Sequence, residues 1–172
     1  MIRIAILVTA LTLPSTAWAI NVGEKAPDFR LKDANGKEYR LSSFKRKILT
    51  VFYEGSQSRN QNKWLKQKYK QLRLNGRINR SHIETIAIAN FRESPLPNAV
   101  VRTAIRLKVS GTKKTVLLDE TGKLQQQWGF RNGRSNIYVF DQNRRLIWKS
   151  SGPMTKKRAR QFLRFLRRMS IR

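Results

Sequence analysis

Residues 51–62 read VFYEGSQSRNQN and join an apolar run to a polar segment with helical character. In chains that alternate strands and helices, such a corner gathers side chains and backbone donors at the carboxyl end of a strand. Ser56 and Ser58 are the hydroxyls at this turn, and a serine nucleophile needs a base within hydrogen-bond reach. The one histidine, His82, begins the next predicted strand, and the chain has no G-x-S-x-G motif. The pattern disfavours a serine hydrolase and predicts that Ser58 caps the following helix.

Glu54 is the carboxylate of this corner. General acid and base catalysis by carboxylates usually needs two of them, and the other candidates, such as Glu84 and Asp119, are isolated in the sequence. Arg59 is close to Glu54 along the chain, so we expect the two to form a structural ion pair. The segment 119–122 lacks the ligand pattern of a calcium loop, and we expect a simple turn there.

The chain contains no cysteine, and this absence excludes whole classes of chemistry. Without a thiolate there is no disulfide, no thiol nucleophile, no iron–sulfur cluster and no thiolate zinc site. A single histidine also excludes a metal site built from several histidines. We therefore expect no metal, no cofactor and no identifiable catalytic residue.

The charge is strongly positive, with 37 Lys and Arg against 10 Asp and Glu and a net charge of +27. Residues 55–83 contain eight basic residues and residues 142–172 contain eleven, and neither segment contains an acidic one. Such a charge attracts polyanions through its summed field and through release of their counterions. A positive charge that serves only solubility remains an open alternative. We expect the anion-binding residues to be Arg59, Lys63, Lys66, Lys70, Lys156, Lys157, Arg160, Arg164, Arg167 and Arg168.

Residues 1–19 have the pattern of a signal peptide. Arg3 precedes the apolar run 4–13, and Ala17-Trp18-Ala19 fits a cleavage site before Ile20. An uncleaved N-terminal anchor remains an alternative. Export would make chromosomal DNA an unnatural target and would leave lipid headgroups, lipopolysaccharide phosphates, extracellular DNA or acidic proteins as anionic partners.

The remaining residues, 20–172, predict one α/β domain with a mixed sheet. The last helix should pack its apolar stripe on the sheet, with its cations on the opposite side, although a stripe left free would suit a membrane surface. The expected elements are an N-terminal hairpin in 21–42 with a turn at Asn35-Gly36, a central strand 48–53, a helix 58–74, a strand 82–89, a helix 98–107 capped by Asn98, a hairpin of 115–118 with 123–128, a hairpin of 137–140 with 145–148, and a helix capped by Thr155 that ends at Met169.

Several segments resemble the redoxins of the alkyl hydroperoxide reductase and thiol-specific antioxidant type. The similar segments are Gly23–Phe29, Leu41-Ser42, Val116–Asp119, Trp128–Phe130 and Ile137–Asp141. The resemblance covers nearly all of residues 20–172 and implies a thioredoxin-like sandwich, in which helices flank a central mixed sheet. The family usually has Gly where Arg46 stands.

The thioredoxin-like members of this family place a Cys-x-x-Cys pair just after the strand. The matching positions are Gln57 and Asn60, and the position of the proline that faces the thiols is near Ser135. Neither amides nor a hydroxyl can exchange disulfides, so the resemblance implies vestigial positions of a redox site. The overall layout is also similar to the YtfJ-like family, which implies a small protein of the bacterial periplasm.

These observations favour a non-catalytic binding or accessory protein whose basic surfaces engage an anionic envelope component or an acidic protein. Two alternatives stay open: an enzyme on the redoxin scaffold that uses unidentified residues other than thiols, and a non-specific nucleic-acid binder.

Overall fold

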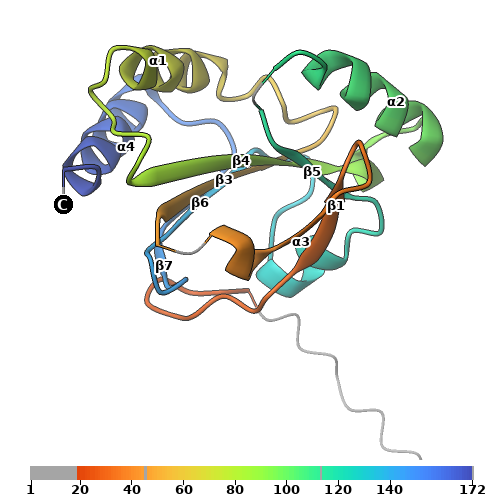
Figure 1. The fold of residues 1–172 in the computed structure, drawn as a ribbon, viewed down its shortest axis with the longest axis horizontal. Coiled ribbons are helices and arrows are strands. Elements are labelled where there is room, and N and C mark those ends of the chain that lie inside the picture. The colour runs from red at the N-terminus through yellow and green to blue at the C-terminus, as the bar shows by residue number, and fades with distance from the viewer. Residues whose placement is uncertain (1–18, 45, 113, 172) are drawn as a thin grey trace, which may run out of the picture.

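The computed structural model describes residues 19–44, 46–112 and 114–171. Seven strands form one mixed sheet in the order β2-β1-β5-β4-β3-β6-β7, and helices lie on both of its faces (Figure 1). The predicted α/β class and mixed sheet are confirmed. The predicted signal peptide lies outside the described residues except for Ala19.

The elements are β1 (Arg30–Asp33), β2 (Glu38–Arg40), the 3-10 turn η1 (Leu41–Phe44), β3 (Ile48–Glu54), α1 (Lys63–Leu74), β4 (Ile83–Asn90), the 3-10 turn η2 (Phe91–Glu93), α2 (Asn98–Val109), β5 (Val116–Asp119), α3 (Lys123–Trp128), β6 (Asn136–Phe140), β7 (Leu146–Ser151) and α4 (Lys156–Met169).

Strand β3 is the centre of the sheet. It pairs in parallel with β4 and antiparallel with β6, and every residue from 48 to 53 is buried. A strand that is covered on both faces needs a continuous apolar run, which is what the sequence shows. Its last residue, Glu54, therefore emerges from the core directly at the corner.

The two faces of the sheet are covered differently (Figure 1). On one face α1 and α4 pack over residues such as Phe52 and Val139, and α2 packs beside them over Leu118. On the other face the N-terminal segment and α3 cover a second core that includes Val51 and Trp128. Among the described residues, no helix is long and apolar enough to span a bilayer.

Helix α4 agrees with the sequence. The Thr155 side chain accepts a hydrogen bond from the backbone N–H of Arg158, which is the expected cap. The apolar stripe, which contains Ala159, Phe162, Leu163 and Leu166, is buried against the sheet. The stripe is therefore committed to the core, and the basic side chains are on the exposed side of the helix.

The predicted hairpin between 115–118 and 123–128 is wrong. Strand β5 pairs with β4 on one side and with β1 on the other, so neither of its edges is free for a hairpin partner. Residues 123–128 form α3 instead, and Leu124 and Trp128, one helical turn apart, are its buried residues. Asn98 also differs from its predicted role, because it is the first residue of α2 and Pro97 occupies the cap position.

Arg46 stands in the left-handed region with φ of 69°. Residues with a side chain pay roughly 1–2 kcal/mol for this conformation, whereas glycine does not. Glycine, which the resemblance to redoxins leads us to expect at this position, would adopt this turn without that cost.

Tyr53 of β3 donates a hydrogen bond from its hydroxyl to Asp119 Oδ2 at 2.9 Å, and both side chains are buried. Asp119 Oδ2 also accepts from the backbone N–H of Gln125 at 3.1 Å, which anchors the start of α3. Burial, together with the negative Asp119, raises the pKa of Tyr53 far above its ordinary value. The phenol therefore stays protonated and remains a donor.

We predict that Tyr53→Phe lowers the free energy of unfolding by about 1–3 kcal/mol, because it leaves a buried carboxylate with one partner fewer. Tyr39→Phe is the matched control, since Tyr39 is half-buried, packs on Phe44 and makes no hydroxyl hydrogen bond to the described residues. Chemical denaturation measures both values. Equal effects of the two substitutions would contradict a stabilising Tyr53–Asp119 contact.

Candidate functional site

The corner after β3 is longer than the sequence predicted. Helix α1 begins at Lys63 rather than at Ser58, and residues 56–62 form turns. Ser58 is buried and its hydroxyl accepts a hydrogen bond from the backbone N–H of Gly55 at 2.9 Å. The predicted helix cap at Ser58 is therefore wrong, because this hydroxyl holds the turn itself.

Glu93 fills the upper part of the corner and is itself only 4% exposed. Ser58 Oγ donates to Glu93 Oε2 at 3.0 Å, and the backbone N–H of Gly133 donates to Glu93 Oε1 at 3.0 Å. Asn90 Nδ2 is a third donor, at 3.3 Å from Oε1. The carboxylate thus connects the turn after β3, the end of β4 and the loop before β6.

Gly55 is needed where Glu93 approaches the chain. A Cβ atom on residue 55 would lie 2.5 Å from Glu93 Cβ and 2.4 Å from Oε2. Atoms do not approach so closely without displacement of the surrounding structure, so a side chain here would expel Glu93 from its position.

Gln61 connects the corner to the loop before β6 through both ends of its amide. Its Nε2 donates to the carbonyl of Gly133 at 2.8 Å, and its Oε1 accepts from the backbone N–H of Ser135 at 2.9 Å. One side chain thereby satisfies a donor and an acceptor of the opposite backbone, and these groups are then occupied.

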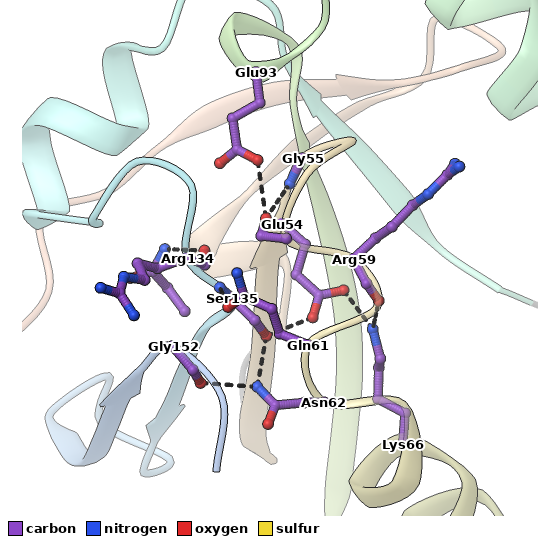
Figure 2. A network of polar contacts seen from close by, with 12 residues as sticks. Glu54, Gly55, Arg59, Gln61, Asn62, Lys66, Glu93, Arg134, Ser135 and Gly152 are labelled. Carbon is purple, nitrogen blue, oxygen red and sulfur yellow. Dashed lines mark hydrogen bonds and ion pairs between the residues drawn. The ribbon is translucent and has the colours of Figure 1, made fainter.

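Asn62 makes a similar connection and is 3% exposed. Its Nδ2 donates to Ser135 Oγ at 2.9 Å and to the carbonyl of Gly152 at 3.0 Å, while its Oδ1 accepts from the backbone N–H of Met154 at 2.9 Å. Asn62 stands at the cap position of α1 but makes no side-chain cap bond. Its amide is used across the corner instead (Figure 2).

Glu54 completes the network from the end of β3 (Figure 2). Ser135 Oγ donates to Glu54 Oε1 at 2.5 Å, and Lys66 Nζ lies 2.7 Å from Oε2. The predicted ion pair with Arg59 is therefore wrong. Arg59 contributes its backbone carbonyl, which accepts a hydrogen bond from Lys66, and Lys66 is one turn into the helix, within reach of the strand end.

The three positions matched to the redox site have different surroundings. Ser135 is fully buried, and its hydroxyl accepts from Asn62 and donates to Glu54. Gln57 and Asn60 are exposed, and their side chains make no hydrogen bond within the described part of the chain. Gln61, Asn62 and Glu93, which the sequence analysis did not select, supply most of the contacts.

This arrangement leaves the corner closed. The polar groups that face one another across it are paired internally, and residues 54–62 line none of four surface hollows of about 290 to 480 Å³ in the described ranges. Nor do three His, Asp or Glu side chains gather into a potential metal site among the described residues. The geometry supports a structural role for the corner rather than the activation of a nucleophile.

The predicted anion-binding residues lie on and beside α1 and α4, which contact each other. Nine of the ten are exposed, and Lys66 is the exception because it is partly buried and pairs with Glu54. Gln161, Arg164, Arg167 and Arg168 line an open hollow of about 470 Å³ on α4. Neither helix contains an acidic residue.

Comparison with known proteins places the chain among redoxins. The sequence profile of the AhpC/TSA family matches residues 22–149, while no curated protein matches the sequence. A candidate protein disulfide isomerase from Bacteroides thetaiotaomicron is 18% identical, with a TM-score of 0.68 over 89% of this chain and 92% of that one. The pneumococcal exposed lipoprotein thioredoxin Etrx1 from Streptococcus pneumoniae is 20% identical. Its TM-score is 0.62 over 81% of this chain and 99% of that one. A thiol peroxidase from Chromobacterium violaceum is 12% identical. Its TM-score is 0.61 over 89% of this chain and 91% of that one.

We predict that Asn62→Ala lowers the free energy of unfolding by about 3 kcal/mol, because it leaves the Gly152 carbonyl and the Met154 N–H without their partner and removes the donor to Ser135 Oγ. Asn60→Ala is the matched control at a position related to the thiol pair, and it should change stability by less than about 0.5 kcal/mol. Urea denaturation measures both. An Asn62→Ala variant as stable as Asn60→Ala would show that the network does not hold the corner.

Proposed function

The chain belongs to the AhpC/TSA family, and we propose that it is an exported binding or accessory protein that performs no thiol chemistry. On this proposal, an anionic partner binds to its exposed basic residues. The observation that supports the proposal best is a contrast within the fold. The corner that carries thiols in related proteins is closed by internal hydrogen bonds, while the outer surfaces of α1 and α4 expose unpaired cations.

The absence of sulfur supports a non-catalytic role. The chain has no cysteine, and disulfide exchange needs a thiolate that attacks a sulfur atom. Ser135, the buried hydroxyl of the corner, already donates to Glu54 and accepts from Asn62. A nucleophile needs an accessible oxygen and a free base, and this hydroxyl has neither.

The basic surface supports binding of a polyanion. We define the α1–α4 face as the nine exposed cations Arg59, Lys63, Lys70, Lys156, Lys157, Arg160, Arg164, Arg167 and Arg168. The salt bridges found among the described residues use other cations, so the charge of this face is not neutralised within the molecule. Neighbouring positive charges on two adjacent helices favour a partner with repeated negative charges.

The N-terminal sequence supports a location outside the cytoplasm. Residues 1–19 have the pattern of a signal peptide, and the likeness to the YtfJ-like family favours the periplasm. The anions there include phospholipid headgroups, lipopolysaccharide phosphates and acidic proteins. Nucleic acid is the less favoured partner, because export separates the protein from the chromosome.

We predict that residues 20–172 bind polyphosphate and vesicles that contain phosphatidylglycerol, and that raising salt from about 50 to 200 mM weakens binding at least ~10²-fold. Replacement of Arg164, Arg167 and Arg168 by Gln should weaken vesicle binding by a further ~10²-fold, at about 1 kcal/mol per charge. Vesicle sedimentation and fluorescence anisotropy measure these affinities.

The control variant replaces Lys25, Lys32 and Lys123 by Gln. It removes the same charge from exposed residues on β1, α3 and the N-terminal segment, and it should bind nearly as the unmodified protein does. Equal losses of binding affinity in the two variants would show that binding depends on net charge alone and not on the α1–α4 face. Binding that is insensitive to salt, or absent for both probes, would overturn the proposal.

We also predict that the purified protein reduces neither hydrogen peroxide nor the disulfides of insulin above the background rate, with dithiothreitol as the electron source. The reason is that no atom of the chain can form the sulfenic acid or mixed disulfide that these reactions require. Turnover that follows the protein through purification would favour the alternative, an enzyme on the redoxin scaffold with other reactive groups.

A further inference from the structure

Helix α2 is held to the sheet by few residues. None of its residues is fully buried, in contrast to α1 and α4. Val101 and Ile105 pack on a small cluster that contains Ala34, Phe91 and Leu118. The inner side of α2 is thus apolar and accounts for its attachment to β5.

The outer side of α2 is apolar as well. Val100 is 50% exposed and Leu107 is 73% exposed, and Leu96, just before the helix, is 55% exposed. Ala104 is also exposed and lies between Val100 and Leu107 on the same side of the helix, because residues three or four apart are neighbours. We call Leu96, Val100, Ala104 and Leu107 the α2 stripe.

Successive residues of an α-helix point about 100° apart, so the α2 stripe lies beside the packed side of the helix and not opposite it. A helix whose apolar surface is wider than one partner covers is normally buried against a second partner. The outer sides of α1 and α4 show the usual alternative, since their exposed residues are mostly cations and glutamines. In α2 one partner is the sheet. The second side is uncovered in the described structure, and it concentrates three of the six large hydrophobic residues that are exposed there.

The charges beside the α2 stripe are positive. Arg106 and Lys108 are exposed on α2, and the helix contains no acidic residue. The nearby Glu120 is occupied, because both nitrogens Nε and Nη2 of Arg102 donate to it, the latter at 2.7 Å from each carboxylate oxygen. Lys108, four residues after Ala104, borders the stripe, and Arg106 lies farther round the helix next to Leu107 in the chain. An apolar stripe with these cations near it complements an apolar surface with carboxylates beside it.

Other occupants fit these charges less well. A second copy of the chain would bring another net charge of +27 into contact. A membrane-bound helix usually carries aromatic residues or a long apolar face, whereas α2 has 12 residues, about 18 Å in length, and no aromatic side chain. The small Ala104 between larger residues instead permits close approach of another helix.

From these contacts and charges we infer that the α2 stripe is a docking surface for an acidic amphipathic helix of a partner protein. The partner helix places its apolar side on Leu96, Val100, Ala104 and Leu107, and its carboxylates pair with Arg106 and Lys108. This surface is separate from the α1–α4 face, so the inference goes beyond the proposed function and does not depend on it.

The test uses a synthetic helical peptide with leucines on one side and glutamates on both flanks, labelled for fluorescence anisotropy, with residues 20–172 of the protein. Val100→Ser combined with Leu107→Ser should weaken its binding at least tenfold. Leu74→Ser is the matched control, since Leu74 is a 61% exposed leucine at the end of α1 and should not affect binding. A peptide with lysines in place of the glutamates should bind at least tenfold more weakly than the acidic one.

The remaining outcomes overturn the inference. They are equal binding of the acidic and basic peptides, no binding of the acidic peptide at about 1 mM, and a self-association that the α2 substitutions abolish. Loss of phosphatidylglycerol vesicle binding in the α2 variant would assign the stripe to membranes instead. If the variant with Gln at 164, 167 and 168 loses the peptide while the α2 variant retains it, the peptide binds to the α1–α4 face, and only the α2 inference fails.

Discussion

The side-chain amides of Gln61 and Asn62 hold the corner after β3 against the loop before β6 and the exit of β7. A carboxamide has both donor and acceptor atoms, so it can pair with the N–H and the C=O of a facing backbone at once. A thiol is a weak partner for either. Gln57 and Asn60, the positions matched to the thiols, make none of these contacts, so closure comes from their neighbours Gln61 and Asn62. Glu54, Lys66 and Glu93 extend the network to the strand ends.

Because the corner is closed, the features that remain available for binding lie on the outer surfaces of the helices. The α1–α4 face consists of exposed cations, and the α2 stripe offers an apolar surface that is bordered by Lys108. Both lie on the same side of the sheet (Figure 1). On the proposed function, the protein would act through these helix surfaces, which need no change in the core that supports them.

Local sequence patterns correctly predicted the elements that follow from the spacing of apolar residues and from capping residues. The apolar run of β3, the Thr155 cap and the stripe of α4 follow from periodicity and capping rules, and the structure confirms them. Residues 123–128 were predicted as a strand, but they form α3 because both edges of β5 are already paired. The spacing of apolar residues carries no information about which sheet edges are paired. Ser135, which contacts both Glu54 and Asn62, lies more than 70 residues away along the chain. The ion-pair partner of Glu54 is Lys66 on α1, 12 residues away, so the shorter sequence distance that favoured Arg59 misled. The adjacent amides Gln61 and Asn62, shortly after a strand, were the sequence feature that could have indicated this network.

Hydrogen exchange at the backbone N–H groups of Gly133 and Ser135 tests the central claim most directly. These groups donate to Glu93 and Gln61, so closure predicts that they exchange as slowly as the amides of β3 and open only when much of the domain unfolds. Exchange at the rate of an unstructured peptide would contradict the account, because it would mean that the corner is open to water and available to a substrate.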